Sequence, residues 1–210
     1  MENEIKTAIT QTLSKLERKC NSFLSIGNGK YPIINERNIS VLFSESLAQG
    51  FNDGEASYEY PFNGSNERYD SIVISNSQKK LFIIEAKEGA LPKSQSAIQN
   101  SSRYSADIGK LEDISEMLKF SKSGFTVYQI FLIGSDSDEE MPTELAKFLS
   151  NNNFNIKSDS IESNSLKYFV AACYKELDIG ESFTKILNRN PALLELVKRR
   201  IGITNPKDAQ

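Results

Sequence analysis

The segment YDSIVISNSQKKLFIIEAK, residues 69–87, decides the fold of this chain. Two runs rich in β-branched and aromatic residues flank a polar turn at residues 75–78, which is typical of a β-hairpin. If Ser75 pairs with Lys80, then Asp70 lies directly opposite Glu85, and facing side chains are about 4.5–5.5 Å apart. A slip of one residue would break this register.

The two strands of this hairpin carry apolar side chains on both faces. The acids share one face with Ile72, Ile74, Leu81 and Ile83, and the opposite face holds Val73, Phe82 and Ile84. Two adjacent carboxylates repel each other, so they need a proton or a cation between them unless solvent reaches them. Lys87 shares the face of Glu85 and supplies one positive charge, and a divalent cation would supply more.

Hydrophobic periodicity predicts helices and strands around the hairpin. The helices are expected at residues 4–25, 35–49, 94–121, 142–150 and 182–200, and the strands at residues 56–62, 69–75, 80–86, 126–133 and 166–174. Asn35 is suited to cap the second helix, and Gly50 is suited to end it. We therefore expect a single domain over residues 1–210 with an α/β fold, in which a mixed sheet of α+β type is flanked by helices.

The composition excludes several classes of active site. The chain has 210 residues and no histidine, which excludes Ser-His-Asp catalysis, His-ligated zinc and histidine proton shuttles. Cys20 and Cys173 have no neighbouring Cys or His that could complete a zinc site. Any catalysis therefore rests on carboxylates, lysine, hydroxyls and hard cations with oxygen ligands.

Charge and hydropathy restrict the expected partners. A net charge of −3 argues against a broadly basic nucleic-acid coat, although a local basic patch can still bind phosphates. No apolar run approaches the roughly 20 residues of a membrane helix, and the N-terminus lacks the layout of a signal peptide. We therefore expect a cytoplasmic protein with no membrane partner.

Residues 68–70 and 84–87, Arg-Tyr-Asp and Ile-Glu-Ala-Lys, resemble the motif of the PD-(D/E)XK nuclease superfamily. Restriction endonucleases, junction resolvases and repair nucleases belong to this superfamily, in which a helix precedes a three-stranded meander and a helix and a further strand follow it. The elements expected over residues 33–134 have a similar order. The resemblance implies a restriction-endonuclease-like core with an N-terminal helix and C-terminal β-α additions. Tyr69 is a departure, because the family often has proline there.

The resemblance implies a role for each residue of the motif. Asp70 matches the metal-binding acid, Glu85 the second acid and Lys87 the catalytic lysine. Ala86 occupies the variable position, and its carbonyl is a candidate for a further metal ligand. Mg²⁺ is the implied cofactor, with Mn²⁺ expected to substitute.

Many members of the superfamily add a glutamate from the helix before the meander. Glu36 and Glu45 compete for that role here, and either can instead be a solvated helix residue. Glu36 is favoured as the metal ligand because it shares a helix face with Ile39 and Phe43, whereas Glu45 lies nearer another face.

The helix expected at residues 94–121 supplies candidate nucleic-acid contacts. Arg103 and Lys110 carry the charged groups that position phosphates, although either residue taken alone is more simply explained as an ordinary exposed helix charge. The resemblance implies DNA as the partner, and a homodimer is expected if both strands of a duplex are cut.

The implied function is a Mg²⁺-dependent deoxyribonuclease, an endonuclease that hydrolyses phosphodiester bonds in a restriction or defence role. Two other hypotheses remain open. The chain can be a catalytically inactive, nuclease-like module that binds nucleic acid or protein. It can also be a plain α/β interaction protein in which the Glu-x-Lys sequence is a coincidence.

Overall fold

The computed structural model describes residues 1–24, 35–61, 68–89, 91–100, 124–136, 140–163 and 166–177. Contacts divide the chain into two units, Met1–Glu176 and Leu177–Gln210. The fold below is that of the first unit. The single domain expected over the whole chain stays a prediction, and the helix expected at residues 182–200 lies outside the described residues.

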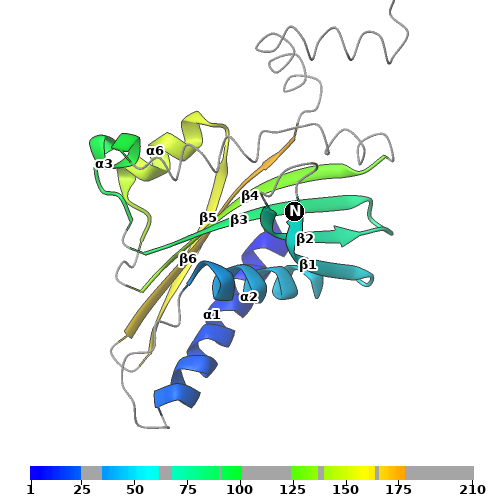
Figure 1. Cartoon of the computed structure of the whole chain (residues 1–210), viewed down its shortest axis with the longest axis horizontal. Coiled ribbons are helices and arrows are strands. Elements are labelled where there is room, and N and C mark those ends of the chain that lie inside the picture. The colour runs from blue at the N-terminus through cyan, green and yellow to red at the C-terminus, as the bar shows by residue number, and fades with distance from the viewer. Residues whose placement is uncertain are drawn as a thin grey trace, which may run out of the picture. The chain divides into compact units, whose positions relative to one another are not determined.

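A six-stranded sheet with the strand order β1-β2-β3-β4-β6-β5 forms the centre of this unit (Figure 1). Its strands are β1 (Gly54–Pro61), β2 (Arg68–Ser75), β3 (Lys80–Glu88), β4 (Thr126–Ser135), β5 (Asn155–Ser163) and β6 (Leu166–Glu176). β3 and β4 run parallel, and the other neighbouring pairs run antiparallel. The predicted mixed sheet is therefore confirmed, while the restriction-endonuclease-like core stays a prediction.

Helices lie on both sides of the sheet (Figure 1). They are α1 (Glu2–Leu24) and α2 (Glu36–Ala48) on one side, and α3 (Gln95–Asn100) and α6 (Thr143–Asn151) on the other. The helix expected at residues 94–121 is represented by α3, and residues 101–123 lie outside the described residues. No helix in the described ranges is both long enough and apolar enough to cross a membrane.

The start of α2 is fixed by a side-chain cap. Asn35 lies in an extended conformation, and its side-chain oxygen accepts a hydrogen bond of 2.7 Å from the backbone N–H of Asn38. This bond satisfies one of the four N–H groups that a helix leaves without an internal partner at its first turn. The predicted capping role of Asn35 is thereby confirmed, and Glu36 becomes the first residue of α2.

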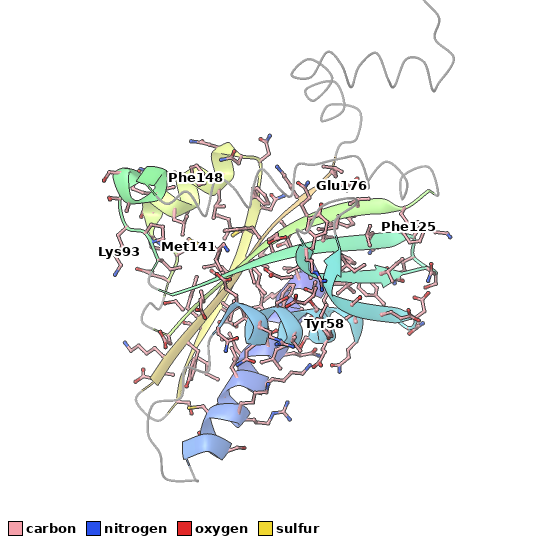
Figure 2. All side chains as sticks on the ribbon, in the orientation of Figure 1. Tyr58, Lys93, Phe125, Met141, Phe148 and Glu176 are labelled. Carbon is pink, nitrogen blue, oxygen red and sulfur yellow. The ribbon has the colours of Figure 1, made fainter. Side chains whose placement is uncertain are left out.

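The main core lies between α1, α2 and one face of the sheet. Phe82 and Ile84 of β3 are fully buried there, together with Ile9 of α1 and Phe43 of α2. Side chains from both helices and from the strands fill this interface (Figure 2). Burying a side chain of this size stabilises the fold by roughly 1.5–3 kcal/mol, so this core holds α2 against the end of the hairpin.

The register of the β2–β3 hairpin is the predicted one. Ser75 pairs with Lys80, and the ladder continues to Ser71 opposite Ile84. It ends one residue before Asp70 and Glu85, so the directly facing pair expected from the sequence is not part of the ladder. Asp70 instead contacts β3 outside the ladder, through its side chain.

The hairpin turn is tied to the start of β1 by Asp53. Its carboxylate accepts hydrogen bonds from the Ser75 hydroxyl at 2.7 Å, and from the backbone N–H and hydroxyl of Ser77 at 2.7 and 2.8 Å. These bonds, with that from the Ser75 hydroxyl the strongest, lower the pKa of Asp53 to about 2. Three strands are thus joined at the end of the sheet that includes this turn.

β5 is a strand that the hydrophobic pattern does not predict. Its sequence, NIKSDSIES, is mostly polar, and no side chain in it is fully buried. The strand lies at the edge of the sheet and pairs along its whole length with β6. Polar and charged residues protect an edge strand from pairing with other chains. Because of these residues, β5 lacks the alternation of apolar and polar side chains that predicts a strand.

Candidate functional site

The carboxylate of Asp70 joins the ends of β2 and β3. Its Oδ2 atom accepts a hydrogen bond of 2.7 Å from the backbone N–H of Ala86, the middle residue of the Glu-Ala-Lys segment. Asp70 itself is half-buried. The predicted acid therefore contacts the predicted motif through its backbone, one residue beyond the last ladder pair.

The strand on the other side of Asp70 is distorted at the same level. Tyr58 pairs with Ser71 and Tyr60 pairs with Tyr69, so Glu59 lies across from Asp70, but the two are not a ladder pair. Glu59 has a φ of 51°, a left-handed conformation that residues other than glycine adopt rarely. Regular pairing is interrupted at Glu59 on one side of Asp70 and ends at Ser71 on the other, and residues in such sparsely populated conformations are enriched at active sites and ligand-binding positions.

Lys87 connects β3 to the beginning of α2. Its Nζ atom lies 3.3 Å from Oε1 of Glu36, with side-chain exposures of 14% for Lys87 and 38% for Glu36. A partly exposed pair of this kind is worth roughly 0–1 kcal/mol, so its main effect is to orient the two groups. Glu45, the competing helix carboxylate, instead pairs with Lys15 of α1 at 3.8 Å.

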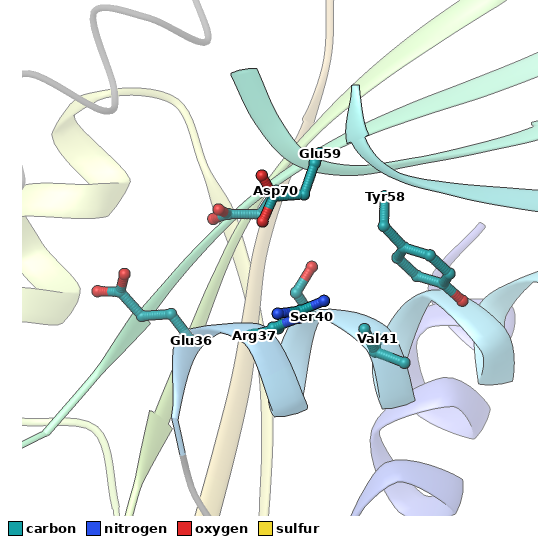
Figure 3. Close-up of a pocket in the computed structure, with 7 residues that line it drawn as sticks. All are labelled: Glu36, Arg37, Ser40, Val41, Tyr58, Glu59 and Asp70. Atoms are coloured by element: carbon teal, nitrogen blue, oxygen red, sulfur yellow. The ribbon is translucent and has the colours of Figure 1, made fainter. Parts of the chain in front are cut away.

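A cleft of about 250 Å³ opens between α2, β1 and β2 beside Asp70 (Figure 3). Its lining residues are Glu36, Arg37, Ser40, Val41, Tyr58, Glu59 and Asp70. The structure thus brings together two predicted residues, Asp70 and Glu36. Glu85 and Lys87 do not line the cleft, although Lys87 reaches one of its walls through the contact with Glu36.

Glu85 is enclosed in the sheet. Glu85 is 2% exposed, and it pairs with Phe131 of β4 in the parallel ladder. A carboxylate at such a depth is stable only with hydrogen bonds or a positive charge beside it. Glu85 is therefore a buried acid at the end of an apolar strand and not a surface charge.

A chain of three serine hydroxyls anchors α2 to β2 next to Asp70. The Ser71 hydroxyl lies 2.8 Å from that of Ser40 and 2.6 Å from that of Ser44, and all three residues are buried. The sequence analysis did not identify this cluster. The available signal was the spacing of Ser40 and Ser44, which places both on one face of α2, but their partner on β2 could not be deduced from it.

The other cleft residues were also missed by sequence reasoning. Arg37 and Tyr58 are exposed, on α2 and β1 respectively. Partial burial, and then the nearby carboxylate of Glu45, raise the pKa of Tyr58 above its usual value. Arg103 and Lys110, the predicted phosphate contacts, lie outside the described residues.

The donor chemistry at Asp70 fits a hard divalent cation better than a soft one. Carboxylates and a backbone carbonyl are oxygen ligands, and Mg²⁺ commonly uses one or two carboxylates with water and phosphate completing its shell. Within the described ranges, however, no group of three or more Asp, Glu, Cys or His side chains lies close enough to hold a metal. A metal at this position would therefore depend on few protein ligands.

No protein-family model matches the chain, and no curated protein matches it in sequence. The resemblance to the PD-(D/E)XK superfamily consequently rests on residues 68–70 and 84–87 and on the order of elements around them. What the site can do is inferred below from its residues and their geometry.

Proposed function

We propose that this chain is a metal-dependent endonuclease that hydrolyses phosphodiester bonds of DNA, as in a restriction or defence enzyme. The observation that carries the proposal is the hydrogen bond from the Ala86 backbone to the Asp70 carboxylate. It places the acid of one strand against the Glu-Ala-Lys segment of the next, beside an open cleft. An acid held against this segment at the edge of a cleft supports a hydrolytic site.

Each residue has a distinct part in the proposed reaction. Asp70 and Glu85 would hold Mg²⁺ or Mn²⁺, with the Ala86 carbonyl as a further ligand. A bound metal of this kind lowers the pKa of its water and polarises a phosphoryl oxygen. Because Asp70 lines the cleft, a metal held by its carboxylate would lie beside the phosphate that is attacked. Glu36 borders the same space and is assigned to the outer part of the metal site.

Lys87 supplies positive charge where negative charge develops on the phosphate. Its contact with Glu36 at 3.3 Å holds the ammonium group at the end of β3. The resulting division of labour is testable, because replacing Lys87 with glutamine should reduce cleavage while leaving metal binding largely intact. An equal loss of both would show that Lys87 does not have this separate role.

The test of the proposal is cleavage of plasmid and single-stranded DNA in the presence of Mg²⁺ or Mn²⁺. We expect Asp70→Asn and Glu85→Gln to lower the rate by about 100-fold or more, the scale of losing a principal electrostatic group. Glu45→Gln is the matched control, since this carboxylate lies on the same helix as Glu36 but pairs with Lys15. Cleavage that survives both substitutions would refute the proposed site.

A binding module without cleavage is the second candidate. In that case the wild type and Asp70→Asn would bind nucleic acid equally and neither would cut it. Homodimer formation stays a prediction for either candidate.

A further inference from the structure

Tyr58 and Arg37 line the cleft but have no part in the proposed metal chemistry. Tyr58, at 38% exposure, is the one large hydrophobic side chain classed as exposed within the described ranges. It lies on β1 and pairs with Ser71, the residue next to Asp70. An exposed aromatic ring beside a reaction site offers a flat surface on which a nucleobase can stack.

Arg37 supplies a cation on the opposite wall. It follows Glu36 on α2 and is exposed, and it forms no ion pair with any part of the chain that the structure describes. Figure 3 shows Arg37 on the α2 wall and Tyr58 on the β1 side, with Asp70 on the sheet side, above α2 in the view. A guanidinium group binds phosphate oxygens through two parallel hydrogen bonds.

Two of the three acids of the cleft already have a cation beside them. Glu36 is matched by Lys87 at 3.3 Å, and Glu59 is matched by Arg68 at 4.0 Å. The Asp70 carboxylate accepts the N–H of Ala86. The guanidinium of Arg37 is therefore available to an anion from outside.

The size of the cleft limits what can enter it. Its volume of about 250 Å³ lies below the roughly 300–1,000 Å³ of sites for drug-sized ligands. A single base can enter such a space, but a base inside a duplex is stacked on its neighbours and paired, so its face is not accessible. Stacking on Tyr58 therefore requires an unpaired nucleotide.

We infer that this cleft binds one unpaired nucleotide of the substrate, with its base on the Tyr58 ring and its phosphate on the Arg37 guanidinium. The inference rests on the proposed nuclease function and specifies its substrate as single-stranded or locally opened nucleic acid. Stacking is worth about 1–3 kcal/mol per base. The phosphate contact adds a component that depends on salt concentration.

The test is fluorescence anisotropy with a labelled oligothymidine of roughly 12 nucleotides, a length within the site sizes of single-strand binders. Chelator replaces the metal so that no cleavage occurs. We expect Tyr58→Leu to weaken binding by about 5-fold to 160-fold and Tyr58→Phe to preserve it. Oligodeoxyuridine and oligouridine of equal length, which differ only in the sugar 2′-hydroxyl, form a second comparison that shows whether the sugar also contributes to recognition.

Salt dependence separates phosphate binding from a structural role of Arg37. Arg37→Gln should weaken binding and reduce the slope of log affinity against log salt by about 0.7, the value for one contact to a single strand. Arg18→Gln, at an exposed position on α1, should change neither quantity. An unchanged slope in Arg37→Gln, or Tyr58→Leu that binds like wild type, would overturn the inference. So would a duplex that binds as tightly as its single strand.

The binding measurements can be interpreted separately from whether the chain cuts DNA. Binding that depends on Tyr58 and Arg37 without cleavage in Mg²⁺ would support the nucleotide site and reject the nuclease. Cleavage that depends on Asp70 while Tyr58→Leu and Arg37→Gln bind normally would support the nuclease and reject the nucleotide site.

Discussion

Replacing Ser71 with alanine removes the hydroxyl that joins β2 to α2 beside the candidate site. Two buried hydrogen bonds are lost, to Ser40 at 2.8 Å and to Ser44 at 2.6 Å. Each is worth about 1 kcal/mol net, and a buried hydroxyl left without a partner costs about 1–3 kcal/mol. Both remaining serines can turn to a carbonyl one helical turn earlier, as Ser46 does with Leu42 at 2.7 Å. We therefore expect a loss of about 2 kcal/mol in the free energy of unfolding.

Urea unfolding followed by far-UV circular dichroism measures this change, since the chain has no tryptophan to report unfolding. Ser57→Ala, at an exposed position on β1, is the matched control and should stay within about 0.5 kcal/mol of wild type. If Ser71→Ala unfolded at the same urea concentration as Ser57→Ala, with an unchanged slope, the hydroxyl chain would not stabilise the contact between α2 and β2.

Three further predictions concern other parts of the fold. Gly54→Ala should destabilise the protein by about 1–3 kcal/mol in urea unfolding, because a Cβ atom there clashes with the backbone of Ala48. The pKa of Asp53 is lowered to about 2, so its contribution to stability is complete well above the unfolded value of 3.8 and is lost as the pH falls through about 2. In thermal unfolding, the difference in melting temperature between wild type and Asp53→Asn should therefore shrink on acidification. Both thiols, Cys20 and Cys173, are buried, and burial raises the pKa of Cys173, so iodoacetamide should label neither in the native protein and both in urea.

The parts of the fold that could be predicted from the sequence are those set by local patterns. The polar turn at residues 75–78 fixes the hairpin register, and the ladder from Ser75 to Ser71 follows it. The cap at Asn35 is equally local, because the side chain bonds to a backbone N–H three residues away. Both depend on contacts within a few residues or across one turn, which a single sequence contains.

The features that could not be predicted depend on contacts between distant segments. β5 is polar, and its pairing with β6 rather than its own residue pattern makes it a strand. The left-handed conformation of Glu59 has no local signature such as glycine. The pairing of β1 with β2, which places Glu59 across from Asp70, joins two segments that residues 62–67 separate in the sequence. The length and composition of that connection do not determine the pairing.

Of the predicted site residues, the structure brings Asp70 and Glu36 to the cleft, and the geometry at Asp70 differs from the predicted one. The sequence indicated that Asp70 and Glu85 face each other, whereas the hydrogen bond of Asp70 is to the Ala86 backbone. The choice of Glu36 over Glu45 followed from helix periodicity, and Glu36 is the one that lines the cleft. Whether these residues act in catalysis stays a prediction.

The measurement that tests the central claim most directly is cleavage of circular single-stranded DNA by wild type and Asp70→Asn, with Mg²⁺ and with chelator. A circular strand has no ends, so any cut shows endonuclease activity on an unpaired substrate. The account predicts linear products and shorter fragments from wild type with Mg²⁺ only, and at least about 100-fold slower cutting by Asp70→Asn. Equal cutting by the two proteins, or cutting that continues in chelator, would contradict it.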